Sequence, residues 1–427
     1  MLIDFSLRNF GSIKDHMSLS AETGERLSRL KETNTIKENY SSLLKNLIII
    51  GPNGSGKSTL IEAIKLMREM VLTDAPNITT KLPYNPFRLN DLKESIPTVF
   101  EIKFNFENKA YDYSFSYTSD SIVQEELKEL LKSGEKTIFQ RNNQEYPILD
   151  HSLIPVAEST KKNSLFLYSA QNANNHDAIS AFRWFQDNLI FVDDHQLIPE
   201  NLAVLMNNSR VKTEFLRFLH FADFNITDVN FHEVPMVIPK RVQDVMNLLE
   251  PGKKIPKAIP QLFAVHKKYN STGDVVGSQE IPLSNESRGT QKIFLIALSI
   301  INAQLNGNGK TILFDEFDDS LHFALSKAII QIFNSTQNKN QFIMTTHELQ
   351  LLNAQLRTDQ IYLMEKDFQG KSSLSSVFDF KDSRDTARHD VHYMKRYVEG
   401  RFGAFPEISV NEMLSALDAN GLSGKRK

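Results

Sequence analysis

The pattern of apolar positions along the chain predicts strands that alternate with helices. Short apolar stretches, either continuous or alternating with polar residues, are typical of strands. They cover residues 3–7, 47–50, 98–117 (as a hairpin), 261–269, 311–314 and 341–345. Apolar residues at helical spacing follow residue 57 and begin again near residue 290. This alternation indicates an α/β core with a mainly parallel sheet.

The middle of the chain has a different pattern. Residues 121 to about 250 show mostly helical spacing broken by loops, with helices expected at 178–188 and 212–221. Three prolines and a glycine between residues 250 and 260 indicate a boundary. The predicted domains are a first lobe at 1–118, a mainly helical insert at 119–260, a second lobe at 261–408 and a flexible tail at 409–427.

Composition excludes several classes of protein. Hydrophobic residues make up 41% and charged residues 24% of the 427-residue chain, which is typical of a soluble globular protein. The absence of cysteine excludes disulfides, thiolate metal sites and cysteine nucleophiles. No signal peptide is visible, and no apolar run approaches the roughly 20 residues that span a bilayer. We therefore expect a cytoplasmic protein without a membrane partner. The net charge of −3 argues against nucleic-acid binding over a broad surface.

Residues 51–58 match the pattern G-x-x-x-x-G-K-[ST]. Glycine lets the backbone bring its amides close to phosphate oxygens, and the helix that follows points its positive end at the same anion. Lys57 is expected to reach the β and γ phosphates of ATP, and Ser58 is expected to bind Mg²⁺. A plain glycine turn is the alternative, which the strand before and the helix after disfavour. The predicted nucleotide-binding residues are Gly51, Pro52, Asn53, Gly54, Ser55, Gly56, Lys57, Ser58 and Thr59.

Two carboxylates end the apolar strand at 311–314. Asp315 is expected to hold the Mg²⁺ shell, and Glu316 is expected to polarise or orient the attacking water. His347 ends the next apolar strand, where a histidine can contact the γ-phosphate or hold the water. Each signal alone is weak, because many strands end in acids and a strand-terminal histidine is often structural. Their order after the glycine-rich loop predicts ATP hydrolysis with Glu316 and His347 as catalytic residues.

Residues 283–291, called here the signature segment, open an apolar helix before the acidic pair. Ser287 fits a helix N-cap, and Gly289 leaves bare backbone beside Thr290, so a second anion-binding helix start is predicted. Two such starts for one nucleotide in one chain would be redundant. They make sense in a head-to-head dimer, where each ATP lies between Lys57 of one subunit and the signature segment of the other. A capped helix without this role is the alternative.

In this order the motifs resemble the ABC-type ATPases of the SMC, RecF and OLD kind. Ser287 to Gln291 looks like their degenerate E-S-x-G-T signature, and residues 317–322 look like their D-loop, which crosses the dimer interface in that group. Residues 3–15 are similar to their first strand. The resemblance implies an α/β P-loop NTPase of ABC-ATPase type, with a mixed sheet core and an inserted mainly helical domain.

The last part of the chain adds a narrower likeness. Residues 359–366 and 397–406 look like the end of bacterial AAA-family ATPases from phage-defence operons, such as the RloA/AbiL type and the ATPase subunit of PARIS systems. In that group ATP-bound dimers or larger assemblies hold a separate effector, often a toprim-like nuclease. The glutamine of a Q-loop is missing from residues 86–89, where the resemblance would place it.

Three functions compete on this basis. The favoured one is a defence-type ATPase that dimerises around ATP and controls a separate effector. The second is a RecF- or SMC-like DNA-repair ATPase, which would need long heptad arms or a concentrated basic groove. The third, a transporter subunit, is disfavoured by the long separation of Lys57 and Ser287. The expected partners are a second copy of the chain, the effector and, in the second hypothesis, DNA.

Other clusters carry less weight. Residues 193–195 (Asp-Asp-His) and 389–392 (His-Asp-Val-His) have metal-ligand side chains, but short polar clusters are more often solvated turns or helix faces. Lys395, Arg396 and Arg401 could meet nucleic acid or an acidic partner. Charge pairing along a surface helix is the simpler explanation.

Overall fold

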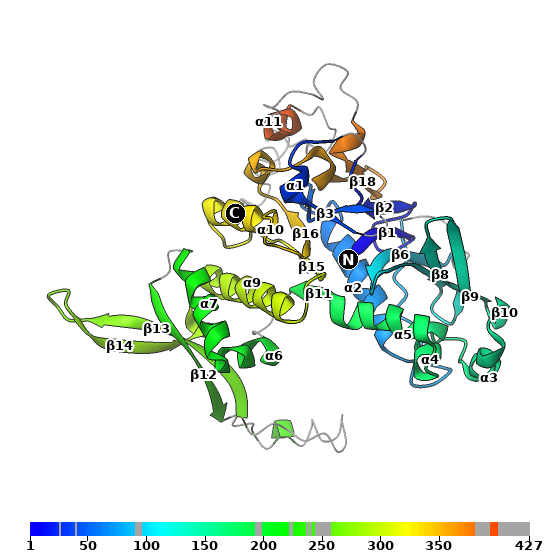
Figure 1. Ribbon diagram of the computed structural model, residues 1–427, viewed down its shortest axis with the longest axis horizontal. Helices are drawn as coiled ribbons and strands as arrows, with labels where there is room; N and C mark the ends of the chain where they lie inside the picture. Colours follow the sequence, from blue (N-terminus) through cyan, green and yellow to red (C-terminus); the bar gives the residue numbers. More distant parts are fainter. Residues whose placement is uncertain are drawn as a thin grey trace, which may run out of the picture.

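Among the described residues, the body of the protein contains two large β-sheets and a small two-stranded sheet, and a three-stranded sheet projects from the body (Figure 1). The computed structural model describes residues 1–24, 27–38, 41–89, 96–192, 199–221, 225–235, 239, 241–243, 258–380 and 393–399. Short elements in these ranges are α1 (Lys31–Asn34), β3 (Thr35–Lys37), β4 (Ser42–Leu44), α6 (Glu200–Ala203) and α11 (Tyr393–Val398). The predicted tail at 409–427 lies outside the described residues.

The central sheet has six strands in the order β11-β15-β16-β5-β17-β18. They span Leu189–Val192, Thr311–Phe314, Gln341–Thr346, Asn46–Ile50, Ile361–Lys366 and Ser372–Ser376. All neighbours are parallel except β17 and β18. Every residue of β5, β15 and β16 is buried, as expected for strands covered on both faces. The predicted α/β core with a mainly parallel sheet is confirmed.

The two faces of the central sheet contact different helices. Leu47 belongs to the core that contains helix α2 (Lys57–Leu72), while Ile48 belongs to the core that contains α9 (Arg288–Leu305) and α10 (Phe323–Phe333). The core around α2 also contains the inner face of the second sheet, so α2 is enclosed between two sheets. Each buried aliphatic side chain contributes about 1.5–3 kcal/mol. This packing fixes the first turn of α2 at the end of β5.

The second sheet is antiparallel, in the order β10-β9-β8-β7-β6-β1-β2. Its strands are β1 (Leu2–Arg8), β2 (Met17–Ser20), β6 (Thr98–Phe106), β7 (Lys109–Tyr117), β8 (Ile122–Leu131), β9 (Gly134–Asn142) and β10 (Glu145–Ile148). The predicted hairpin at 98–117 is confirmed as β6 and β7. Its two turn residues, Glu107 and Asn108, both have left-handed backbone with φ of 49° and 66°.

Helix was predicted across the start of the insert, and this is wrong for residues 122–148, which form β8, β9 and β10. The cause is a pair of inward-facing glutamates, Glu125 and Glu129, which are buried on the same side of β8 as Leu127 and hide the period-two pattern. The predicted domain boundary near residue 118 falls at the turn between β7 and β8, which are neighbours in one sheet.

The helical prediction holds further along the insert. Helices α3 (Ile154–Ser159), α4 (Phe166–Asn172), α5 (His176–Arg183) with a π-helical turn (Trp184–Asn188), and α7 (Ser209–Phe221) follow. Both expected helices, at 178–188 and 212–221, are therefore found. Between them β11 joins the edge of the central sheet beside β15, so the insert contributes to the ATPase core itself.

The projecting sheet consists of β12 (Ile226–Pro235), β13 (Ala258–Tyr269) and β14 (Val275–Pro282), paired antiparallel (Figure 1). The strand predicted at 261–269 is part of β13. Helix α7 links this sheet to the body, because Phe215 packs edge-to-face on Phe294 of α9 with ring centroids 4.9 Å apart. The signature segment follows directly after β14.

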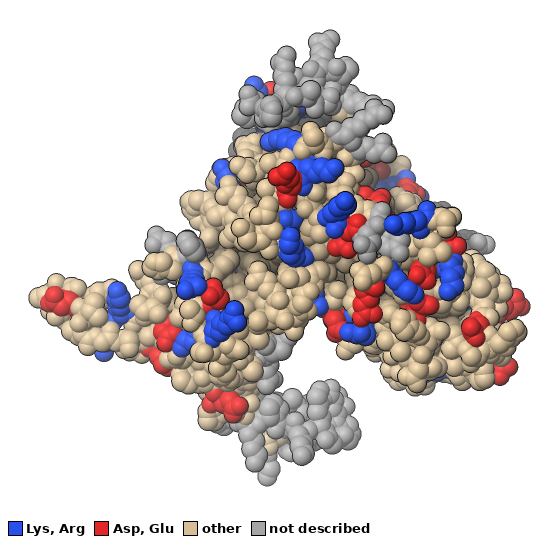
Figure 2. Space-filling view, in the orientation of Figure 1, with Lys and Arg blue, Asp and Glu red and all other residues tan. Residues whose placement is uncertain are grey.

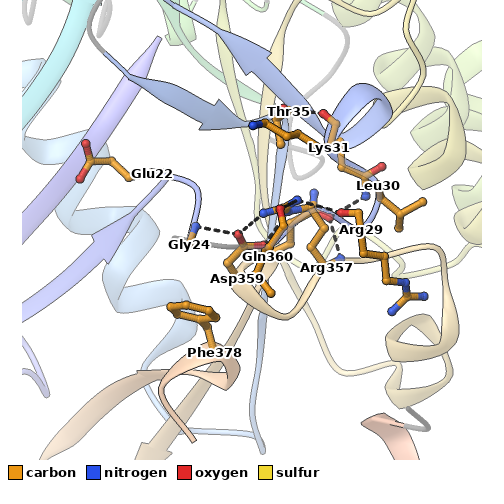
Figure 3. Close-up of polar contacts among 12 residues, drawn as sticks. Glu22, Gly24, Arg29, Leu30, Lys31, Thr35, Arg357, Asp359, Gln360 and Phe378 are labelled. Carbon is orange, nitrogen blue, oxygen red and sulfur yellow. Dashed lines mark hydrogen bonds and ion pairs between the residues drawn. The ribbon is translucent and has the colours of Figure 1, made fainter. Parts of the chain in front are cut away.

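Residues far apart in the sequence meet before β17 (Figure 3). The guanidinium of Arg357 donates two hydrogen bonds to the carboxylate of Asp359, at 2.9 and 2.7 Å, and two more to backbone carbonyls of the N-terminal segment. Asp359 also accepts the amide hydrogen bond of Gly24, and Asn34 donates to Gln360. These buried contacts hold the segment that follows β2 against the central sheet.

Candidate functional site

The glycine-rich loop, residues 51–56, joins β5 to α2. A Cβ on Gly51 would lie 2.3 Å from the carbonyl oxygen of Met364. Gly56 has φ of 110°, and a Cβ there would lie 2.4 Å from Ser372 Oγ. Gly54 has open space around it but needs glycine for its φ of 74°. The loop therefore requires glycine at these three positions, either because neighbouring atoms leave no room for a Cβ or because φ is positive.

Lys57 is the first residue of α2 and is only 4% exposed. Its Nζ donates to the carbonyl oxygens of Gly51 (2.8 Å) and Pro52 (3.1 Å) and lies 3.4 Å from Nδ1 of His347. Burial lowers the pKa of Lys57 to about 8, although nearby carboxylates, Asp315 first among them, oppose the shift. The ammonium group is therefore poorly solvated and close to the acidic pair.

The other predicted residues of the loop lie around the same helix start. Ser58 and Thr59 are half-buried in the first turn of α2, while Asn53 and Gly54 are exposed at the tip of the loop. Ser55 is 1% exposed, and its Oγ has no hydrogen-bond partner within the described residues. The geometry thus gathers backbone amides, one cation and several hydroxyl groups around one helix N-terminus, as phosphate binding requires.

Asp315 and Glu316 follow directly after β15 and contact the end of β16. The hydroxyl of Thr345 donates to Asp315 Oδ1 and accepts the hydrogen bond of the Glu316 amide at 2.8 Å. Glu316 has left-handed backbone with φ of 48°, and its carbonyl accepts a hydrogen bond from Lys292 Nζ. The side chain of Glu316 is exposed. Within the described chain, Asp315 Oδ2 makes no hydrogen bond.

His347 follows β16 and faces Lys57. Burial and the positive charge of Lys57 lower the pKa of His347, while Glu316, Asp318 and Asp315 act in the opposite direction. The imidazole is therefore mainly neutral at pH 7. Because β5, β15 and β16 are parallel, their carboxyl ends meet at one edge of the sheet, and this brings the predicted lysine, carboxylates and histidine together.

The signature segment lies at the start of α9. Ser287 caps this helix, because its Oγ accepts the hydrogen bond of the Thr290 amide at 3.2 Å. Ser287 is exposed, and a Cβ on Gly289 would lie 2.6 Å from the carbonyl oxygen of Ser320. The signature segment thus contacts the segment 317–322. In the described part of the chain, no hydrogen bond joins Ser287 or Gly289 to the glycine-rich loop.

Sequence reasoning gave no individual role to three residues near the acidic pair, one of which, Asp318, lies in the segment 317–322. Thr345 is a polar residue in a fully buried strand, and Lys292 is a lysine only 6% exposed in an apolar helix. A polar residue inside an apolar stretch can be recognised in the sequence, so both residues could have been singled out. Asp318 has a buried Oδ1 with no hydrogen-bond partner among the described residues, and its charge opposes the lowering of the pKa of Lys57 and of His347 that burial causes.

The oxygen atoms at this site fit Mg²⁺. Magnesium prefers hard oxygen ligands and is usually bound through one or two carboxylates together with substrate phosphates and water. Asp318 Oδ1 is a buried carboxylate oxygen without a hydrogen-bond partner among the described residues. Asp315 accepts the hydrogen bond of Thr345 at Oδ1, and Ser58 adds a hydroxyl oxygen in the first turn of α2. When bound, the ion would neutralise charge on the nucleotide phosphates.

The remaining candidates are the polar clusters and the basic residues near the end of the chain. Residues 193–195, 389–392 and Arg401 lie outside the described residues. Lys395 lies 3.9 Å from Glu399 four residues on, as charge pairing along a helix predicts. Among the described residues, no three His, Cys, Asp or Glu side chains cluster so that they could hold a metal ion. The described helices include none with the length and apolar character needed to cross a membrane.

The fold and the order of these motifs define a P-loop ATPase of the ABC type. The chain belongs to the AAA-domain family described as "AAA domain, putative AbiEii toxin, Type IV TA system", whose model matches residues 47–353. The predicted P-loop fold and the resemblance to bacterial AAA-family ATPases of the ABC type are confirmed. The narrower likeness to the RloA/AbiL type or to PARIS systems stays a prediction.

Curated relatives carry names that agree with the predicted activity. The chain is 23% identical over 391 residues to the retron Vc95 probable ATPase of Vibrio cholerae, covering 81% of this chain and 73% of that protein. It is 24% identical over 354 residues to an ATP/GTP phosphatase of Helicobacter pylori, covering 77% of this chain and 85% of the relative. The protein is therefore an ATPase, as predicted.

Similar solved structures are heads of Smc proteins. One is an Smc head bound to the C-winged helix domain of ScpA, with a TM-score of 0.48 and 15% identity over 88% of this chain and 97% of that chain. Another is the SMC head domain from Thermotoga maritima, with a TM-score of 0.40 and 13% identity over 88% of this chain and 98% of that chain.

Proposed function

We propose that this ATPase forms a head-to-head homodimer around two ATP molecules, and that the ATP-bound dimer controls a separate effector protein in defence against phage. The observation that carries the proposal is the division of phosphate-binding features between two places. Lys57 and the acidic pair lie at the ends of the central strands, whereas the capped start of α9 exposes Ser287 and, within the described residues, makes no hydrogen bond to the glycine-rich loop.

Within one subunit, the residues at the strand ends provide the catalytic half of the site. Lys57 exchanges the carbonyl oxygens of Gly51 and Pro52 for phosphate oxygens of ATP. Ser58 and Asp315 hold Mg²⁺. The exposed carboxylate of Glu316 orients the attacking water, and the neutral His347, close to Lys57, contacts the γ-phosphate.

The second subunit provides the other half. Bare backbone at Gly289 and the hydroxyl of Ser287 lie at a helix N-terminus, whose partial positive charge stabilises a phosphate. Because Gly289 contacts Ser320, the segment 317–322 reaches the interface together with the signature segment. A subunit that hydrolyses its ATP then loses the anion that joins it to its partner, so hydrolysis times the assembly.

Control of an effector is supported by the kind of relatives that the chain has. Its family description names a toxin system, and one relative is the ATPase of a retron. The DNA-repair alternative requires a concentrated basic surface. On the face shown in Figure 2, Lys and Arg side chains are interspersed with Asp and Glu.

The decisive experiment uses Glu316→Gln, which keeps the size of the side chain and removes its charge. We expect this variant to bind ATP and remain a dimer, while turnover falls by about 10²-fold or more, within the range found for positioned acid–base groups. Light scattering after gel filtration, with ATP and with ADP, measures the dimer.

The matched variant is Lys57→Ala, which should lose ATP binding and remain monomeric with either nucleotide. A protein that binds Glu316→Gln in the presence of ATP, and does not bind Lys57→Ala, would be identified as the effector. Unchanged turnover in Glu316→Gln would remove Glu316 from catalysis, and a monomer in ATP would contradict the dimer.

A further inference from the structure

We propose that Thr345 is a positioning residue for ATP hydrolysis. Through a single hydroxyl group it sets the geometry of both residues of the acidic pair, Asp315 and Glu316. This inference rests on the roles proposed above for these two acids. Thr345 is the fifth residue of β16 and is fully buried, so water does not replace its hydrogen bonds.

The hydroxyl of Thr345 has only one hydrogen-bonding arrangement open to it. The backbone amide of Glu316 can only donate, so Thr345 Oγ1 accepts there, at 2.8 Å. The one hydroxyl hydrogen is then free for Asp315 Oδ1, which accepts it. The bond leaves the opposite oxygen, Asp315 Oδ2, available for a cation. One side chain thus fixes the rotation of Asp315 and the position of the Glu316 amide at the same time.

The peptide units around Glu316 are held on both sides. Thr345 accepts the amide of Glu316 with its hydroxyl and the amide of Phe317 with its own carbonyl, at 3.0 Å. Lys292 Nζ donates to the carbonyl oxygen of Glu316. Between these contacts Glu316 adopts φ of 48°, a conformation that residues other than glycine seldom adopt. The left-handed conformation determines where the carboxylate of Glu316 points, and it persists because its surroundings hold it.

Removal of the hydroxyl alone is possible with Thr345→Val, which keeps the shape of the side chain. The Glu316 amide then loses the acceptor of its partly buried hydrogen bond, so Glu316 can relax and Asp315 becomes free to rotate. We expect kcat to fall about 10- to 100-fold, the size of effect that a displacement near 1 Å produces. ATP affinity should stay within about threefold, because Lys57 is untouched, while half-saturation by Mg²⁺ should move to higher concentration.

Thr345→Ser separates positioning from packing. Serine keeps the hydroxyl and loses the methyl group, so a positioning role predicts kcat close to the original protein and a normal Mg²⁺ requirement. A packing role predicts the reverse order, because serine leaves a small cavity in the sheet and valine does not. Equal loss of activity in both variants, or a greater loss in the serine variant, would overturn the proposal.

Thr311 provides a matched control at the opposite end of β15. It is also fully buried, its hydroxyl accepts the amide of Leu2 at 3.0 Å and donates to Gln341 at 2.9 Å, and it is far along the strand from Asp315. Thr311→Val should lower the melting temperature without changing kcat. If both valine variants lose activity in proportion to their loss of folded protein, Thr345 has only a structural role.

Failure of this inference is distinguishable from failure of the proposed function. If Glu316→Gln abolishes turnover while Thr345→Val does not, the acid is catalytic but Thr345 does not position it. If Glu316→Gln itself turns over normally, the assignment of the acidic pair is wrong.

Discussion

At the scale of single residues, this ATPase holds several groups away from their ordinary state. Lys57 is a buried ammonium bonded to backbone carbonyls, Glu316 is left-handed, and Asp318 has a buried carboxylate oxygen with no partner in the described chain. Such states cost free energy and persist only where the surrounding structure imposes them. All three lie around the place where the phosphates of ATP are expected.

The state of Lys57 predicts uptake of a proton when ATP binds at high pH. Burial lowers the pKa of the free lysine to about 8, and phosphate oxygens around it would raise this pKa again. Below pH 8 most of the lysine is already charged, so uptake on its account is a fraction of a proton, about a quarter at pH 7.5. Above pH 8 it is largely neutral, so uptake should approach one proton and affinity should fall by up to about tenfold per pH unit.

Titration calorimetry in two buffers of different ionisation enthalpy, at pH 7.5 and pH 9, measures this uptake. Lys57→Arg is the control, because a guanidinium stays protonated throughout this pH range. If this variant still binds ATP at pH 9, binding should be accompanied by no proton uptake at this position. An equal number of protons at both pH values in the original protein would show that Lys57 keeps its charge when free.

What a sequence can predict at this scale depends on how local the interaction is. Gly51 to Thr59 form one continuous motif, so their shared position around a helix start follows from their spacing. The contacts of Thr345 and Lys292 with Glu316 depend on the alignment of β16 and α9 against the end of β15. Their polar character inside apolar elements is visible in the sequence, but their partners are not.

At the scale of elements, the strands of the central sheet follow from the sequence because both their faces are apolar. The strand β8 does not, because a buried ion pair occupies its inner face. Glu125 accepts hydrogen bonds from the hydroxyl of Tyr113 and from the amides of Phe166 and Leu167, and it lies 3.5 Å from Arg141. The glutamate thus caps the start of α4 from the neighbouring sheet, a tertiary contact that no local pattern reveals.

This network predicts a large effect on stability. Glu125→Ala leaves Arg141 buried without its carboxylate and the first amides of α4 without an acceptor, so the free energy of unfolding should fall by about 3–5 kcal/mol. The single tryptophan, Trp184, is a suitable probe, because it is buried and stacks on Phe104 of the same core, with ring centroids 4.2 Å apart. Urea unfolding followed by its fluorescence measures the change.

The neighbouring Glu126→Ala is the control for this prediction. Glu126 lies 3.0 Å from Lys128 in a partly exposed ion pair, so its loss should cost no more than about 1 kcal/mol. Equal shifts of the urea midpoint in the two variants would show that the buried network contributes no more than a surface pair.

At the scale of the whole molecule, the glycine-rich loop and the signature segment, which we propose bind phosphate, adjoin helices that pack in separate cores on opposite faces of the central sheet. The glycine-rich loop follows β5, while the signature segment begins α9, which covers the other face of the same sheet. The order of motifs predicts this architecture. The projecting sheet and the entry of β11 into the central sheet could not be predicted, because strand order in a sheet is a tertiary property.

Composite sites make a prediction that mixing of two inactive subunits can test. Lys57→Ala removes the catalytic half of a site, and Ser287→Arg places a bulky side chain where the partner's nucleotide would lie, so each variant alone should be inactive. In a mixed dimer both changes fall in one composite site, and the other site combines an intact Lys57 with an intact Ser287. Lys57→Ala is expected not to dimerise with itself, and Ser287→Arg blocks the same contact in its own dimer, so the dimers that form are mixed. Each mixed dimer has one working site out of two, so equal mixing before ATP is added should restore up to about half of normal turnover.

The same mixture separates the two possible arrangements of the site. If Ser287 served the nucleotide of its own subunit, every subunit in the mixture would carry one defect and turnover would stay at the level of the separate variants. Mixing either variant with the double variant Lys57→Ala/Ser287→Arg is the matched control, because no dimer then contains an intact composite site. Recovery in the first mixture and none in the control would require ATP to lie between two subunits, since only a shared site combines residues from both.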